Sequence, residues 1–203
     1  VYAASPTPEE MDDAGRWSAA KFSGATPDLP FSFVYGGRSS RELLGSWAVE
    51  DAEETLDDQR TRRVLTYTDP DSGLRVRCEV IEYRDYPAAD WVIYLENTGD
   101  QDTPIIEDIQ ALDTVFTRQG PQPLPERRWT ADGWETVEVL IDPGEFIVHH
   151  AQGGHTRIDA FEPLDDVLGP GQELSIGGYS SESHLPFFNV EWPGGGIIGG
   201  IGW

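Results

Sequence analysis

Glycine and proline recur at short intervals along the whole chain, and this spacing constrains the fold more than any other feature. The 203 residues contain 22 glycines and 15 prolines, and both residue types interrupt helices. Runs rich in Val, Ile, Leu, Tyr and Thr separate these breaks, as expected of short strands joined by turns. We therefore predict an all-β protein, an antiparallel β-sandwich or barrel with few and short helices.

The clearest of these strands form a hairpin over residues 62–68 and 74–83. The connecting residues 69–73 read Asp-Pro-Asp-Ser-Gly, which is turn chemistry. In the second strand, apolar residues at every other position, among them Val76 and Cys78, are expected to share one face. Cys78 is therefore expected to be a small buried residue rather than a reactive thiol, because no cationic residue shares its face.

Further elements are expected on both sides of this hairpin. Strand-like runs flanked by turn residues occupy residues 31–35, 90–96, 105–112, 145–150, 173–176, 187–192 and 196–203. We expect the hairpin and the next two strands to form a four-stranded meander. Helices are predicted over residues 8–20 and 39–44. Segment 119–133, which contains three prolines, is predicted to be a long surface loop.

The chain is predicted to hold a single β domain. It has no repeat, low-complexity linker or shift in composition that marks a boundary. Residues 1–28 are expected to form an amino-terminal extension with a short helix, and residues 29–203 the β domain. The sequence stops within an apolar, glycine-spaced strand, so we expect it to be part of a longer protein.

Charge excludes several classes of partner. Lys and Arg total 14 against 37 Asp and Glu, a net charge of −23, which repels nucleic acids and anionic lipids. The longest charge-free, weakly apolar run, residues 194–203, is half as long as a membrane span. Neither a nucleic acid nor a membrane is therefore an expected partner. The scarcity of lysine, with Lys21 alone, fits either adaptation to high salt or an arginine-rich genome, and the cellular compartment is left open.

The histidines and acids of the chain do not form a recognisable active site. His149, His150 and His155 are close in sequence, and His184 could join them from another strand. Adjacent residues of a strand face opposite ways, so His149 and His150 are not expected to share one ion. Carboxylate pairs are frequent without specific spacing, and no nucleophile elbow, phosphate loop or dinucleotide motif occurs. No catalytic residue, metal or cofactor is predicted.

Tryptophans are the candidate ligand-binding residues, because an indole ring stacks on the apolar face of a sugar. The candidates are Trp17, Trp47, Trp129 and Trp134, and packing in a core or an interface is the alternative for each. The three remaining tryptophans, Trp91, Trp192 and Trp203, lie in expected strands and are assigned to the core.

The last forty residues resemble a known family. The segment Gly177-Gly178-Tyr179-Ser180-Ser181 leading to Pro186-Phe187-Phe188, followed by the glycine-flanked strand 194–203, resembles the end of the amino-terminal β-domain of family 36 glycoside hydrolases, the α-galactosidase group. Residues 30–40, 43–47, 63–67 and 91–97 are also similar to such domains. The resemblance spans roughly residues 29–203.

The resemblance implies a large antiparallel β-supersandwich that precedes a catalytic (β/α)₈ barrel. In that family a nucleophile and an acid/base carboxylate act from the barrel with retention of configuration, so no acid of this chain is assigned a catalytic role. The implied partners are the barrel of the same protein, an α-galactoside-type carbohydrate bound by the whole enzyme, and a second subunit in a homo-oligomer. An Asp-Phe-Arg segment that some members bring near the sugar is missing. Arg38, Trp47 and Trp134 are the candidates for sugar contact.

The sequence is compatible with two other functions. The chain could be an autonomous carbohydrate-binding module that works through Trp129 and Trp134. It could also be an interaction domain whose edge strand, residues 196–203, pairs with another subunit.

Overall fold

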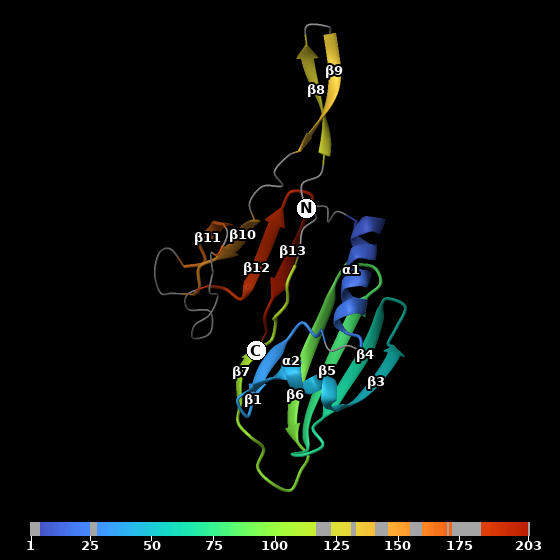
Figure 1. Cartoon of the computed structure of the whole chain (residues 1–203), viewed down its shortest axis with the longest axis vertical. Coiled ribbons are helices and arrows are strands. Elements are labelled where there is room, and N and C mark those ends of the chain that lie inside the picture. The colour runs from blue at the N-terminus through green and yellow to red at the C-terminus, as the bar shows by residue number, and fades with distance from the viewer. Residues whose placement is uncertain are drawn as a thin grey trace. The chain divides into compact units, whose positions relative to one another are not determined.

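The all-β prediction is confirmed by the structure, a computed structural model that describes residues 5–24, 28–116, 123–130, 133–140, 146–154, 160–169, 171 and 184–202. Its sheets are antiparallel throughout the described residues. The chain divides into two compact units, Val1–Val115 and Phe116–Trp203. Each unit has its own strands (Figure 1).

The predicted amino-terminal helix is confirmed as α1, Pro8–Lys21. It begins with a capping box: the Glu10 N–H donates to Thr7 Oγ1 at 3.2 Å, and the Thr7 N–H donates to Glu10 Oε2 at 2.6 Å. These two bonds satisfy backbone donors that the first turn leaves unpaired. The second predicted helix is confirmed as α2, Ser40–Leu43, which continues into a 3₁₀ turn, Leu44–Ser46.

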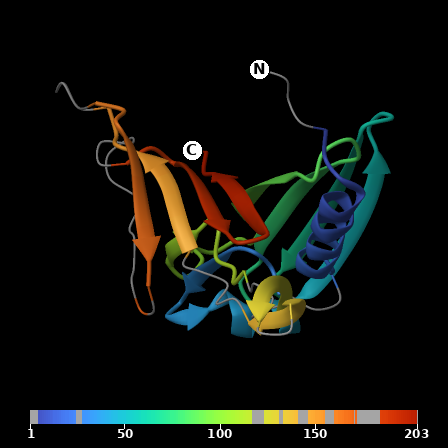
Figure 2. The same cartoon turned by 90° about the horizontal axis from the view of Figure 1, so that it is seen from above.

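The main sheet of the first unit contains the predicted hairpin. Its strands, in spatial order, are β3 (Ala48–Thr55), β4 (Arg60–Thr68), β5 (Leu74–Tyr83) and β6 (Ala89–Asn97). Figure 2 shows these strands side by side with α1 across one face. The alternation predicted for β5 is confirmed, because Leu74, Val76, Cys78 and Val80 are buried and their neighbours are not.

The predicted four-stranded meander was wrong in its last strand. That strand, β7 (Ile106–Gln110), pairs with β1 (Ser32–Tyr35) instead of β6, and β1 also pairs with β2 (Arg38–Ser39). The turn between β1 and β2 uses Gly36 and Gly37 at positive φ, a conformation that glycine adopts without strain. The small sheet is therefore built around a strand from early in the chain.

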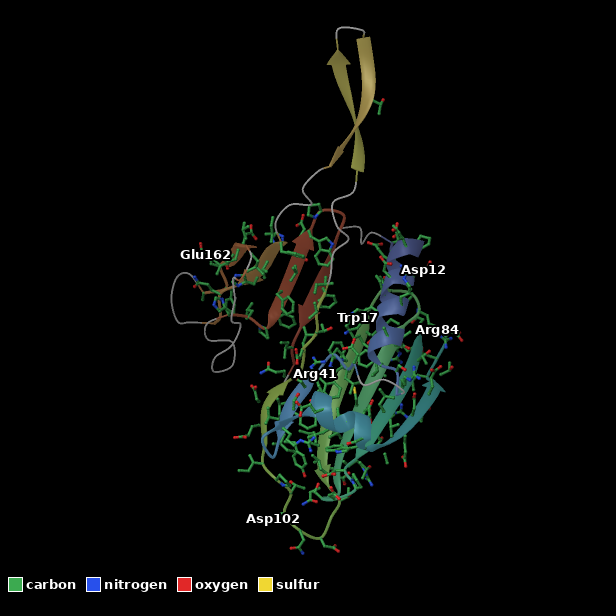
Figure 3. The ribbon with its side chains drawn as sticks, in the orientation of Figure 1. Asp12, Trp17, Arg41, Arg84, Asp102 and Glu162 are labelled. Atoms are coloured by element: carbon green, nitrogen blue, oxygen red, sulfur yellow. The ribbon has the colours of Figure 1, made fainter. Side chains whose placement is uncertain are left out.

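One core lies between the two sheets of the first unit. Phe33 and Tyr35 of β1 belong to the same buried cluster as Leu65 and Tyr67 of β4 and the inner residues of β5. The helix and its C-cap residue Phe22 add to it, since the rings of Trp17 and Phe22 lie 6.1 and 5.4 Å from the ring of Trp91. Figure 3 labels Trp17 on α1. The first unit is thus a two-layer sandwich with a helix packed against it.

The open edge of the main sheet carries an ion pair that makes stability depend on pH. Arg63 of β4 donates two hydrogen bonds to Asp51 of β3, at 2.9 and 2.7 Å. These bonds hold the pKa of Asp51 below its ordinary value, although partial burial opposes the shift. A carboxyl group with a lowered folded-state pKa stabilises the fold above its unfolded pKa, and this contribution is lost as pH falls through the folded-state pKa.

Replacing Asp51 by asparagine is therefore expected to lower the free energy of unfolding by about 1 kcal/mol at neutral pH, since the pair is partly exposed. The difference from the unmodified chain should shrink as pH falls below about 4, where the unfolded chain binds the proton. Urea unfolding at several pH values measures this difference. Asp102→Asn, in the exposed connection between β6 and β7, is the control and should change little. A difference that stays constant with pH would contradict the assignment.

The proline-rich segment was predicted to be a loop, and this prediction was wrong for residues 123–130. They form β8 (Pro123–Thr130), which pairs with β9 (Gly133–Leu140) as a two-stranded ribbon. A strand of a two-stranded ribbon pairs on one side, so the N–H groups of every second residue point away from the partner strand and form no ladder hydrogen bond. Proline, which has no N–H, fits at those positions. Pro123 and Pro125 are two residues apart, as this alternation requires.

The other sheet of the second unit has the spatial order β11-β10-β12-β13. These strands are β10 (Phe146–Ala151), β11 (Pro163–Leu168), β12 (Phe187–Trp192) and β13 (Gly195–Gly200). The predictions for β10 and β12 are confirmed, and β13 is shorter than predicted. The strand predicted over residues 173–176 lies outside the described residues. The boundary predicted between residues 28 and 29 stays a prediction.

Candidate functional site

His149 lies at the centre of one face of the β10–β13 sheet. Register places it opposite Asp165 on β11 and opposite Asn189 on β12. Its Nδ1 is 2.7 Å from Asp165 Oδ1, and its Nε2 is 2.9 Å from Glu191 Oε2. The hydrogen bond to Asp165, followed by that to Glu191, raises the pKa of His149. The imidazole thus joins three strands through two carboxylates.

This arrangement leaves His149 without a free nitrogen. The two carboxylates bind opposite ends of one ring, so neither ring nitrogen is open to a metal ion or a substrate proton. Among the described residues, no group of three or more His, Cys, Asp or Glu side chains could hold a metal ion. The trio is therefore best described as a cross-strand electrostatic clip.

Exposed apolar side chains surround this clip. Ile198 on β13 is opposite Asn189, and Val167 on β11 is opposite Ile147, so both share the face of His149. Phe187, two residues before Asn189 on β12, points the same way. Ile198 is 86% exposed, Phe187 64% and Val167 47%. We refer to Phe187, Ile198 and Val167 with the clip as the His149 face.

His150 lies on the opposite side of the sheet, as expected of adjacent strand residues. Its side chain is fully buried, and its Nε2 is 2.7 Å from Asp166 Oδ2. The ring of His184 has its centroid 5.0 Å from that of His150. An isolated bridge between Gln152 and His184 brings the two histidines together from segments 34 positions apart.

A shallow groove lies on the outer face of the main sheet of the first unit. It is lined by Glu50, Thr66, Thr68, Arg75, Arg77 and Glu96. The Arg77 guanidinium lies 4.1 Å from the centre of the Tyr94 ring, and Arg75 is 3.3 Å from Glu96. Tyr94 is 41% exposed. The groove thus offers hydrogen-bond donors and acceptors beside an aromatic ring, a combination that suits polar ligands with hydroxyl groups.

The five predicted sugar-contact residues have different surroundings. Trp17 is partly buried and packs with Phe22 and Trp91 against the core of the first unit. Trp47 is 8% exposed and its ring meets that of Tyr35 edge-on at 5.9 Å. It therefore lacks the open face that stacking on a sugar needs, and packing, the alternative assignment, is its role. Arg38 is exposed on β2 and is the register partner of Tyr35 on β1.

Trp129 and Trp134 are direct partners in the register of β8 and β9. Their side chains lie outside the described part of the structure, and their role in binding sugar stays a prediction. Most of the family-like segment 177–188 also lies outside the described residues, which begin again at residue 184.

Sequence reasoning missed the groove and the clip. Alternation in β5 predicts Arg75 and Arg77 on one face, and the structure agrees. The groove as a whole comes from four strands and depends on their register. Asp165 and Glu191 are 16 and 42 residues from His149, and no local pattern connects them.

Comparison of the chain with protein-family models, curated proteins and solved structures finds no match. In the described part of the chain, no helix is both long and apolar enough to cross a membrane.

Proposed function

We propose that this chain is the non-catalytic β-domain of an α-galactosidase-like retaining glycoside hydrolase, and that it supports a catalytic (β/α)₈ barrel. The all-β fold agrees with the expectation from the family resemblance. The proposal assigns bond cleavage to the barrel, and no residue of this chain is given a catalytic role. An α-galactoside is the proposed substrate class of the whole enzyme, and a homo-oligomer its proposed assembly.

The observation that carries this proposal is the exposed apolar surface of the His149 face. Phe187 and Ile198 belong to β12 and β13, the two strands within the segment that resembles the family. Large apolar side chains gathered on one exposed sheet face favour contact with another protein surface. A barrel of the same protein is a partner of suitable size, and it would cover these side chains permanently.

The first test is the reading frame that encodes the chain. The proposal requires the codons after Trp203 to continue into a (β/α)₈ sequence with two carboxylates on barrel strands. The second test uses that whole enzyme with a chromogenic α-galactoside. Ile198→Glu would bury an unpaired charge at the contact, at a cost of several kcal/mol, and is expected to lower hydrolysis at least about tenfold.

Ile105→Glu is the matched control, because Ile105 is 72% exposed but lies in the first unit, away from β12 and β13 in the sequence. It should leave hydrolysis within about twofold of the unmodified enzyme, as most surface changes do. A reading frame without a barrel overturns the proposal. Equal activity of the two variants removes the His149 face as the barrel contact.

A carbohydrate-binding module is the second candidate, and the groove on the main sheet is the observation that favours it. Arg77 and Tyr94 combine a hydrogen-bond donor with an aromatic ring at one place, as saccharide sites do. In this case the isolated chain would bind galactosides with saturable heat in calorimetry, and Arg77→Ala would abolish that heat. Absence of binding at millimolar galactoside favours the supporting role.

A further inference from the structure

Two buried histidine nitrogens have no hydrogen-bond partner within the described part of the chain. They are Nδ1 of His150 and Nδ1 of His184. A buried polar atom without a partner costs roughly 1–3 kcal/mol and requires an explanation, such as a missing ion or water. The two atoms belong to neighbouring rings, and one ligand bound to both would account for both.

The hydrogen bond at the other end of the His150 ring fixes the chemistry of its Nδ1. Asp166 is a carboxylate and accepts, so the Nε2–H of His150 donates to Asp166 Oδ2 at 2.7 Å. The remaining nitrogen of a neutral imidazole then carries an electron pair. A histidine that donates one N–H to a carboxylate and keeps its other nitrogen free has the arrangement of a metal ligand.

The spacing of the two rings agrees with one shared ion. With a metal–nitrogen bond of about 2.1 Å, each ring centre lies about 3.2 Å from the ion, and two such rings in tetrahedral geometry have centres about 5 Å apart. The centroids of His150 and His184 are 5.0 Å apart, with the ring planes at 58°. This centroid distance is the one expected of two imidazole rings that bind a single ion.

We propose that His150 and His184 bind one divalent transition-metal cation of the Zn²⁺ class through their Nδ1 atoms, and that Asp166 orients His150. Imidazole nitrogen selects Zn²⁺, Ni²⁺ or Cu²⁺ over Mg²⁺ and Ca²⁺, which prefer oxygen. The inference is independent of the proposed glycosidase function. It departs from the sequence expectation because the interval of 34 residues between the two histidines has no recognisable ligand spacing.

The ion would tie β10 to the segment that enters β12. His150 belongs to β10, and the residue after His184 continues this junction, because the Leu185 N–H donates to the Ala151 carbonyl at 2.9 Å. An ion that binds the folded chain alone multiplies the folding equilibrium constant by one plus the ratio of the free ion concentration to the dissociation constant. At a free concentration 100 times the dissociation constant, the shift is about 100-fold. The ion would therefore stabilise the folded chain.

The test is calorimetric titration of the chelator-treated chain with Zn²⁺, in excess Mg²⁺ to occupy surface carboxylates. We expect one ion per chain. His150→Gln and His184→Gln should each abolish stoichiometric binding, and Asp166→Asn should weaken it about 10- to 100-fold. His149→Gln is the matched control on the opposite face and should bind as the unmodified chain does.

Imidazole ¹⁵N spectra of the unmodified chain provide a second measurement that needs no variant. Saturating Zn²⁺ should shift Nδ1 of both His150 and His184, while Nε2 of His150 stays protonated. Unmoved Nδ1 resonances would overturn the proposal and leave water as the ligand between the rings. Zn²⁺ binding that survives both glutamine substitutions would also overturn it.

Discussion

Replacing Trp47 by alanine is expected to lower the free energy of unfolding by about 3–5 kcal/mol, as for other buried tryptophans. Trp47 is 8% exposed and belongs to the core cluster between the two sheets of the first unit. Its removal leaves a cavity beside Tyr35, whose ring it meets edge-on at 5.9 Å. Chemical denaturation followed by far-ultraviolet circular dichroism measures the change without depending on tryptophan fluorescence.

Arg38→Ala is the matched control for this substitution. Arg38 is the register partner of the same Tyr35 but is exposed, so its loss should change stability by less than about 0.5 kcal/mol. Both residues are sugar-contact candidates from the sequence, and the comparison tests whether Trp47 packs in the core. If Trp47→Ala changed stability as little as Arg38→Ala, the burial of Trp47 would be wrong.

Cys78 is expected to resist thiol reagents for as long as the chain stays folded. Its side chain is fully buried in β5, and burial raises the pKa of its thiol to about 12. The thiolate that reacts is therefore scarce, and no reagent reaches it without unfolding. With a typical folding free energy, labelling should be at least about 10³-fold slower than in the unfolded chain. Absorbance after addition of an aromatic disulfide reagent measures both rates.

A second cysteine position gives the contrast that this experiment needs. Val92 on β6 is 50% exposed, so Val92→Cys in a Cys78→Val background should react at a rate close to that of the unfolded chain. Cys78 shares the inner face of β5 with Val80, which is also fully buried. Equal labelling rates at positions 78 and 92 would show that Cys78 is not buried on that face, and would contradict the assignment of the β5 faces.

Apolar alternation predicted those strands that have one buried face. The predicted limits of β5 and β12 agree with the structure, because turn residues bound both strands. Alternation could not reveal β3, in which every residue is exposed and four of the eight are acidic. It also could not distinguish β7 as a partner of β1, because that choice depends on contacts between distant segments.

The candidate sites were less predictable than the strands. The sequence indicates that His184 could join the histidines at 149–155, but strand alternation predicts the faces of His149 and His150 alone. That prediction is confirmed, because the two side chains lie on opposite faces. It could not predict that a bridge at Gln152 brings His184 to the buried side. Such a contact follows from strand register, which local sequence does not encode.

The edge strands β3 and β13, one from each four-stranded sheet, differ in how they can meet another molecule. β3 presents Glu50, Asp51, Glu53 and Glu54 along its length, so a like-charged chain approaching to extend that sheet is repelled. β13 contains glycine and isoleucine alone and carries no charge. Addition of a strand from another molecule is therefore favoured at β13 over β3. In concentrated solution, self-assembly or aggregation should start from β13. A lysine substituted into β13 should oppose this assembly, because it places a charge on the apolar edge.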